Sequence, residues 1–262
     1  MWGDEKPMDI DTQKVPETVR VLHCSVIANN KLYILFGKNG FMLDSIICWD
    51  FEKGEWENIK TSGDKIERRI GATIQFVKQK NSFYIFGGQD GDGFSSNQLF
   101  EVNLDTFNCK LVSKAIIDGT DYGVHLHSML FDEKDLFYFF GGKNEKGAKN
   151  DFFRFSLSQN KWSVLKQEGS VPRPIFSHFS FHLDTTMILF DPKNILDLHV
   201  FDFLKGKWNK LNIDSKIKEI SKEGCTITHD KLNKCFYIVG GISSEFQLDI
   251  GFNFNFNFPF LF

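Results

Sequence analysis

The sequence has few of the residues that stiffen or cross-link small domains. Proline occurs 6 times in 262 residues, and the 5 cysteines are an odd number without any Cys-x-x-Cys spacing. An odd set of unpaired cysteines is typical of reduced, buried thiols rather than of a disulfide framework or a zinc cluster. We therefore expect a fold that is held together by packing alone.

Long apolar runs and an excess of one charge are also missing. Lys and Arg total 31 against 34 for Asp and Glu, a net charge of −3. No apolar run reaches the roughly eighteen residues of a membrane helix, and the polar, acidic residues 1–11 do not resemble a signal peptide. Scattered basic residues do not favour nucleic acid or an anionic membrane as a partner. The composition predicts a soluble, cytoplasmic protein.

Helical periodicity is the third absence, since no window of about eleven residues repeats apolar side chains at helical spacing. The apolar segments are instead short, β-rich and separated by turn residues. With 42% hydrophobic residues the chain can bury a sizeable core in one domain. These features predict an all-β fold.

A short signature ends an apolar run five times along the chain. We place it at Phe36, Phe86, Phe140, Phe190 and Val239. The intervals are 50, 54, 50 and 49 residues. Glycine pairs follow three of these positions, whereas Gly37-Lys38 and Asp191-Pro192 follow the other two. A fixed period of this size indicates a repeat architecture, in which one unit cannot bury its apolar face without neighbours.

Each of the first four repeats continues with a second strand-like run and then a residue that opens a further strand. These opening residues lie 18 to 23 positions after the signature, at Trp56, Cys109, Trp162 and Trp208. A glycine pair after one strand and a tryptophan on an outer strand resemble the kelch motif, from about Val19 to Ile250. The resemblance implies a kelch-type β-propeller, in which four-stranded antiparallel sheets, the blades, surround a channel. The substitution Asp191-Pro192 is still turn chemistry, so the fourth blade is expected to persist.

We predict a single propeller domain over residues 1–250, with four complete blades and a degenerate fifth. Its repeats cover residues 19–61, 62–114, 115–167, 168–214 and 215–250. The fifth repeat lacks an outer-strand tryptophan, and residues 1–18, near Trp2, are at a suitable distance to supply that strand. Five blades would be unusual for the family, so the alternative is a fragment of a larger propeller.

Residues 251–262 alternate Phe and Asn and form a low-complexity tail. A period of two is compatible with a strand that has phenylalanine on one face, and equally with an aggregation-prone terminus. The pattern does not distinguish the two.

Two closely spaced histidines are the main candidates for chemistry. His125 and His127 would lie on one face of a strand, which is half of a metal site. However, His23, His127 and His178 precede their signatures by 13, 13 and 12 residues. A residue type that recurs at one repeat position usually belongs to the repeat itself. We therefore predict no metal, no cofactor and no catalytic residues; the alternative is a metal- or small-molecule-dependent enzyme with an unrecognised site.

The predicted function is a non-enzymatic protein-interaction module or scaffold, monomeric, that binds other proteins through loops on one face. A propeller displays variable loops on a rigid frame. Arginines before the first strands (Arg20, Arg68, Arg69 and Arg173) would either bind an acidic partner or tie neighbouring loops together. The candidate partner-binding residues lie after the signatures and before the first strands: Asn39, Arg69, Asp90, Asp92, Phe94, Tyr122, Asn144 and Arg173.

Overall fold

Short β-strands make up nearly all of the regular structure. The computed structural model describes residues 19–183, 185–194, 197–211, 223–230, 235–242 and 252–255, and these contain no α-helix. The chain divides into two units, Met1–Lys114 and Ala115–Phe262. The all-β prediction is confirmed.

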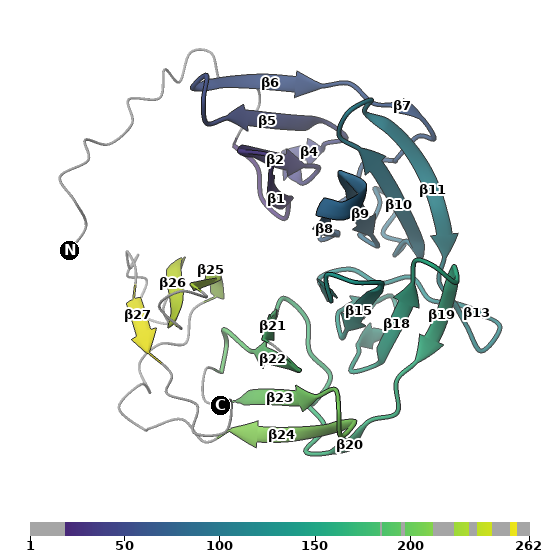
Figure 1. Cartoon of the computed structure of the whole chain (residues 1–262), viewed down its shortest axis with the longest axis vertical. Coiled ribbons are helices and arrows are strands. Elements are labelled where there is room, and N and C mark those ends of the chain that lie inside the picture. Colours follow the sequence, from purple (N-terminus) through teal and green to yellow (C-terminus); the bar gives the residue numbers. More distant parts are fainter. Residues whose placement is uncertain are drawn as a thin grey trace. The chain divides into compact units, whose positions relative to one another are not determined.

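The first unit contains two sheets, which correspond to the first two repeats (Figure 1). The strands of one sheet are, in spatial order, β1 (Cys24–Ala28), β2 (Lys31–Leu35), β5 (Ile46–Asp50) and β6 (Glu55–Ile59). Those of the other are β8 (Thr73–Val77), β9 (Ser82–Phe86), β10 (Gln98–Asn103), β11 (Asn108–Lys114) and β7 (Ser62–Gly63). Outside the sheets are the hairpin of β3 (Lys38–Asn39) and β4 (Phe41–Met42) and a 3-10 turn at Lys78–Lys80.

The second unit contains the third and fourth repeats as sheets of the same kind (Figure 1). The third sheet has the order β14 (Ser128–Phe131), β15 (Leu136–Phe140), β18 (Phe152–Ser156) and β19 (Lys161–Val164). The fourth has the order β21 (Phe179–Leu183), β22 (Thr186–Phe190), β23 (Leu198–Asp202), β24 (Lys207–Leu211) and β20 (Glu168–Gly169). The fourth blade therefore persists despite Asp191-Pro192, as predicted. Two small hairpins pair β12 (Ile116–Ile117) with β13 (Thr120–Asp121) and β16 (Lys143–Asn144) with β17 (Gly147–Ala148).

The fifth repeat and the tail together form a sheet with three described strands. They are β25 (Glu223–Asp230), β26 (Cys235–Ile242) and β27 (Phe252–Asn255), all antiparallel. Strand β27 comes from the Phe/Asn tail, so four residues of this tail are a strand. The suggested closing strand near Trp2 and residues 256–262 lie outside the described residues.

Each four-stranded sheet has two chemically different ends. Strand pairing places the start of the first strand beside the end of the second and the start of the third, as Cys24, Leu35 and Ile46 show. We call this the signature end, because the glycine signatures lie there, and the opposite end the turn end. Loops that lead into a sheet and loops that follow its signature therefore lie together at the signature end.

In the first, second and fourth sheets, the same kind of hydrogen-bonded turn closes the turn end. An oxygen of Asp50, Asn103 or Asp202, at the end of a third strand, accepts the backbone N–H groups two and three residues further on, at 2.9–3.1 Å. Asx turns of this kind fix a tight connection without help from the rest of the fold.

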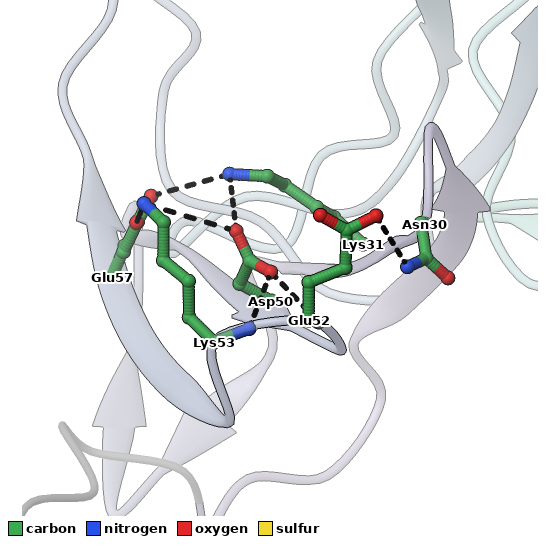
Figure 2. A network of polar contacts seen from close by, with 6 residues as sticks. All are labelled: Asn30, Lys31, Asp50, Glu52, Lys53 and Glu57. Atoms are coloured by element: carbon green, nitrogen blue, oxygen red, sulfur yellow. Dashed lines mark hydrogen bonds and ion pairs between the residues drawn. The ribbon is translucent and has the colours of Figure 1, made fainter.

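In the first sheet an ion-pair network adds to this turn (Figure 2). Lys31 Nζ lies 2.9 Å from Asp50 Oδ2, and Lys53 Nζ lies 3.2 Å from Glu57 Oε1. The hydrogen bond from Lys31, followed by those from the turn backbone, lowers the pKa of Asp50 to about 2. The Asp50 side chain is buried, but Lys53 is largely exposed and solvent weakens its ion pairs, so this network orients the turn more than it stabilises the sheet.

An apolar core lies between the first and second sheets in the first unit, and between the third and fourth sheets in the second unit. In the first unit, the rings of Tyr33 and Phe83 lie 5.5 Å apart between the two sheets. In the second unit, Trp208 contacts the rings of Phe140 and Phe152 at 5.0 and 5.7 Å. Each sheet thus buries a face that it could not bury alone, which is the physical basis of a repeat fold.

The structure corrects the position of the signature in the first repeat. Strand β2 ends at Leu35, in the place that Phe86 and Phe140 take at the ends of β9 and β15. Phe36 therefore occupies the first glycine position. Its φ of 60° matches 68° at Gly87 and 62° at Gly141. The prediction that Lys38 replaces the second glycine is wrong by one residue, because Gly37 takes that position with φ 89°.

The second glycine position is enclosed by the loop that leads into the same sheet. A Cβ atom on Gly142 would lie 2.6 Å from Val124 Cγ2 and 2.7 Å from His127 Cβ. On Gly37 it would lie 2.7 Å from the carbonyl oxygen of Val21. Glycine is needed here both for its left-handed φ and for the missing side chain.

We predict that Phe36→Gly destabilises the protein although it removes a left-handed non-glycine residue. The ring of Phe36 is 1% exposed. Losing a buried phenylalanine costs about 3–5 kcal/mol, whereas relief of the left-handed conformation returns about 1–2 kcal/mol. Urea unfolding should show a net loss of about 1–4 kcal/mol. The control Phe41→Gly, at an exposed ring, should change stability far less; equal effects would contradict this account.

Candidate partner-binding surface

The loop after the second signature is a rigid turn that exposes an aromatic ring. Asp90 Oδ1 accepts the backbone N–H groups of Asp92 at 3.0 Å and of Phe94 at 2.9 Å. Gln89 Nε2 donates to the carbonyl of Gly93 at 2.9 Å. The ring of Phe94 is 64% exposed. Of the predicted residues, Asp90 therefore shapes the loop, and Phe94 is available to a partner.

A second exposed ring lies in the same unit, on the β3–β4 hairpin. Asn39 pairs with Phe41 across the hairpin, and Lys38 is bridged to Val21 in the loop that leads into the sheet. Phe41 is 64% exposed. The sequence prediction missed Phe41, although a large apolar residue directly after Gly40 was an available signal, because turn tips are normally solvent-exposed.

The corresponding hairpin in the second unit carries charge instead of an exposed ring. Asn144 Oδ1 accepts the backbone N–H of Lys146 at 2.9 Å, which closes the β16–β17 turn. Lys143 Nζ and Lys193 Nζ lie 4.8 and 5.3 Å from the centre of the Phe176 ring. Cation–π contacts of this kind hold both lysines near one ring.

Tyr122 and Arg173 are held by carboxylates of the loops at the signature end. The Tyr122 hydroxyl donates to Asp151 Oδ2 at 2.5 Å, and its ring lies edge-on to Phe153 at 4.7 Å. Burial and the neighbouring carboxylate raise the pKa of Tyr122. Arg173 is 58% exposed and its NH2 group donates to buried Asp191 at 2.5 Å. Both residues position loops, and more than half of the Arg173 side chain remains exposed to solvent.

Arg69 is not a surface residue, which removes it from the candidate binding set. Its side chain is 4% exposed. Its guanidinium donates to the carbonyl oxygens of Glu67 and Gly87, both at 2.9 Å, and lies 5.7 and 5.5 Å from the rings of Phe36 and Phe100. Burial lowers the pKa of Arg69 to about 10, so it stays charged at neutral pH.

Arg20 has the same role in the first sheet. It is buried, and its NH1 group donates to the carbonyl oxygen of Phe36 at 3.1 Å, the position that Gly87 takes for Arg69. Of the two predicted roles for these arginines, the structure supports the tying of loops for Arg20 and Arg69. A guanidinium has enough donors to hold several carbonyl groups at once.

Large apolar side chains that are exposed gather at the signature ends. Among the described residues, seven of the eleven exposed large apolar residues lie in loops there: Val19, Val21, Leu22, Phe41, Phe94, Ile116 and Val171. Exposed apolar side chains on rigid loops are the usual anchors of protein–protein contacts.

The histidines at the recurring repeat position lie beside the glycine positions of the repeats. A Cβ atom placed on Gly37, Gly142 or Gly141 would lie 3.1, 2.7 or 2.9 Å from the side chain of His23, His127 or His178, respectively. His178 Nε2 also lies 2.9 Å from Ser128 Oγ. Across the described part of the chain, no group of three or more His, Cys, Asp or Glu side chains has the arrangement of a metal site.

A family comparison covers most of the chain. The model of the "KLHDC2/KLHL20/DRC7 Kelch-repeats domain" matches residues 22–246. The chain belongs to the kelch-repeat family. Its sheets are therefore blades of a kelch-type β-propeller, in agreement with the resemblance that the glycine pairs and tryptophans indicate. Kelch domains are generally protein-interaction modules and mostly lack enzymatic activity.

Several curated proteins are distant relatives. Human kelch domain-containing protein 1 is 26% identical over 85% of this chain and 63% of its own length. Tip elongation aberrant protein 3 of Schizosaccharomyces pombe is 24% identical over 68% of the chain, and acyl-CoA-binding domain-containing protein 5 of Arabidopsis thaliana is 25% identical over 64%. The matches span 18% and 26% of the latter two proteins. Within the described residues, no helix has the length and apolar character needed to cross a membrane.

Variants of the adjacent residues Arg68 and Arg69 test whether Arg69 holds its loop in place. We predict that Arg69→Ala lowers the free energy of unfolding by about 2–4 kcal/mol, because it leaves buried carbonyl groups without a donor. Arg68→Ala, at an exposed side chain, should change it by less than about 0.5 kcal/mol. Urea titrations of the two variants measure the difference. Similar values for both would show that Arg69 does not hold the loop.

Stability should fall in mild acid because two histidines are buried in their neutral form. Burial lowers the pKa of both His127 and His178 to about 3. The unfolded chain takes up protons below about pH 6.5, so the stabilisation is complete above that pH and is lost as the pH falls toward 3.

The expected loss at pH 5 is about 2 kcal/mol for each of these histidines. Urea unfolding of the wild type and of His178→Gln at pH 7.5 and pH 5 measures the contribution. The variant should lose about 2 kcal/mol less between the two pH values. If the variant and the wild type lost the same stability between pH 7.5 and pH 5, this would contradict the burial of neutral His178.

Proposed function

We propose that this kelch propeller is a non-enzymatic interaction module that binds other proteins through its signature-end loops. The observation that carries this proposal is the exposure of Phe41 and Phe94 at the tips of turns that are fixed by their own hydrogen bonds. Rigid exposed rings bind at a low entropic cost, since neither the loop nor the side chain needs much ordering.

The remaining candidates lie on loops of both units. Asn39 and Asp92 are exposed on the same two loops of the first unit. In the second unit, Asn144 and Arg173 lie on signature-end loops, and Tyr122 supports a loop rather than offering its hydroxyl. Arg69 is not included. A cytoplasmic, monomeric protein without nucleic-acid or membrane partners is the expectation from composition.

The test compares exposed apolar residues at the two ends of the sheets. Phe41→Ser with Phe94→Ser removes both rings at the signature end, and Phe51→Ser with Leu204→Ser is the matched control at the turn ends, where the side chains are 43% and 80% exposed. Partners captured by the wild-type protein are identified and re-measured as purified proteins. We expect the first variant to bind at least about tenfold more weakly and the control to bind normally.

Circular dichroism and urea unfolding should show that both double variants stay folded. A partner that binds the signature-end variant with wild-type affinity, or that is lost only in the control, would contradict the proposal.

A further inference from the structure

Two of the four-stranded sheets carry a fifth strand on their outer edge. In the second sheet, β7 runs parallel to β11 and pairs Gly63 with Cys109. In the fourth sheet, β20 runs parallel to β24 and pairs Gly169 with Trp208. The chain segment just before each sheet supplies this covering strand.

Both covering strands end on a glycine that cannot be replaced. Gly63 and Gly169 have φ values of 83° and 80°. A Cβ atom on either would lie 2.3 Å from the carbonyl oxygen of the residue it pairs with. Each glycine stands ten positions before the first strand of its sheet, at Thr73 or Phe179. An added side chain would push the covering strand off the edge.

The other two sheets lack this glycine at the same distance. Ten residues before Ser128 stands Asp118, and here β12 pairs with β13 instead of with β19. Ten residues before Cys24 stands Lys14, and positions 4–18 contain no glycine. Among the described strands, none pairs with the outer edge of β6. Residues 4–18 thus lack the glycine on which both covering strands end.

A polar atom at this edge also lacks a partner. Trp56 Nε1 on β6 is buried and has no hydrogen-bond acceptor among the described residues. In the fourth sheet, Trp208 takes the same place and its Nε1 donates to Gln167 Oε1 at 2.8 Å. Gln167 directly precedes the covering strand. A buried donor without an acceptor is costly. Among the described residues, the first sheet has neither a covering strand nor a side chain in the position of Gln167.

We propose that the outer edge of β6 binds an extended segment of a partner protein. The segment adds parallel to β6 and places a glycine opposite Trp56. Two residues before that glycine it carries a side-chain acceptor, in the position of Gln167, that takes the Trp56 N–H. An open strand edge offers backbone groups for such strand addition. This edge is separate from the signature-end loops, so either surface can fail its test without the other.

The probe is a peptide with the sequence of residues 166–172, KQEGSVP, added to the purified full chain. The indole N–H signals of 15N-labelled protein report binding, and Trp56→Phe identifies the signal of Trp56. We expect this signal to shift on titration. A peptide with Gly169→Ala should bind at least about tenfold more weakly, because alanine does not tolerate the left-handed conformation.

A peptide with Gln167→Ala tests the acceptor. It should bind the wild type more weakly than KQEGSVP does, whereas Trp56→Phe should bind the two peptides equally. No shift of the Trp56 signal, a shift of the Trp208 signal alone, or equal binding of the glycine and alanine peptides would overturn the proposal. Slow exchange of the Trp56 indole proton in the free protein would overturn it as well, since the edge would already be covered.

Discussion

The close approach of one loop backbone to the second glycine position is the contact on which the rest of the structure depends. Gly37 N–H donates to the carbonyl of Arg69 at 3.0 Å, and Gly142 N–H donates to that of Ile175 at 2.8 Å. Each bond joins one sheet to the loop that leads into the next. Since the acceptor lies in a signature-end loop, the contact that holds two sheets together also fixes the backbone that presents the exposed side chains.

This constraint explains where the sequence follows the repeat and where it departs from it. Pro192 stands at the second glycine position of the fourth sheet and has no N–H to donate, so this sheet lacks the inter-sheet bond on that side. Asp191, at the first glycine position, is buried and holds Arg173 and the N–H of Lys193 instead. These side-chain hydrogen bonds lie within the fourth repeat, as do the bonds from Arg20 and Arg69 to the first glycine positions of their own sheets.

The period, the all-β class and the kelch resemblance were predictable from the sequence, because glycine pairs and outer-strand tryptophans recur for a physical reason. The register of the first repeat was not predictable. In the sequence, Phe36 looks like the last residue of a strand, but it follows the strand in a left-handed conformation. The sequence also did not reveal that Arg69 is buried while Arg68 is exposed. Two adjacent arginines in the loop before a first strand are equivalent in the sequence, and only the path of the backbone decides which side chain is buried. Phe94 was recognised from its loop, while Phe41 was missed within a two-residue hairpin strand.

The most direct measurement is the stability of Gly142→Ala against Gly91→Ala. A Cβ atom on Gly142 would meet Val124, His127 and the carbonyl of His125 within 2.8 Å, whereas one on Gly91 has nothing within 4 Å. We predict that Gly142→Ala lowers the free energy of unfolding by at least about 2 kcal/mol and speeds amide hydrogen exchange at Ile175 and in β15 and β22 together. The Gly91→Ala control should stay within about 0.5 kcal/mol of the wild type. Wild-type stability and exchange in Gly142→Ala would contradict the account.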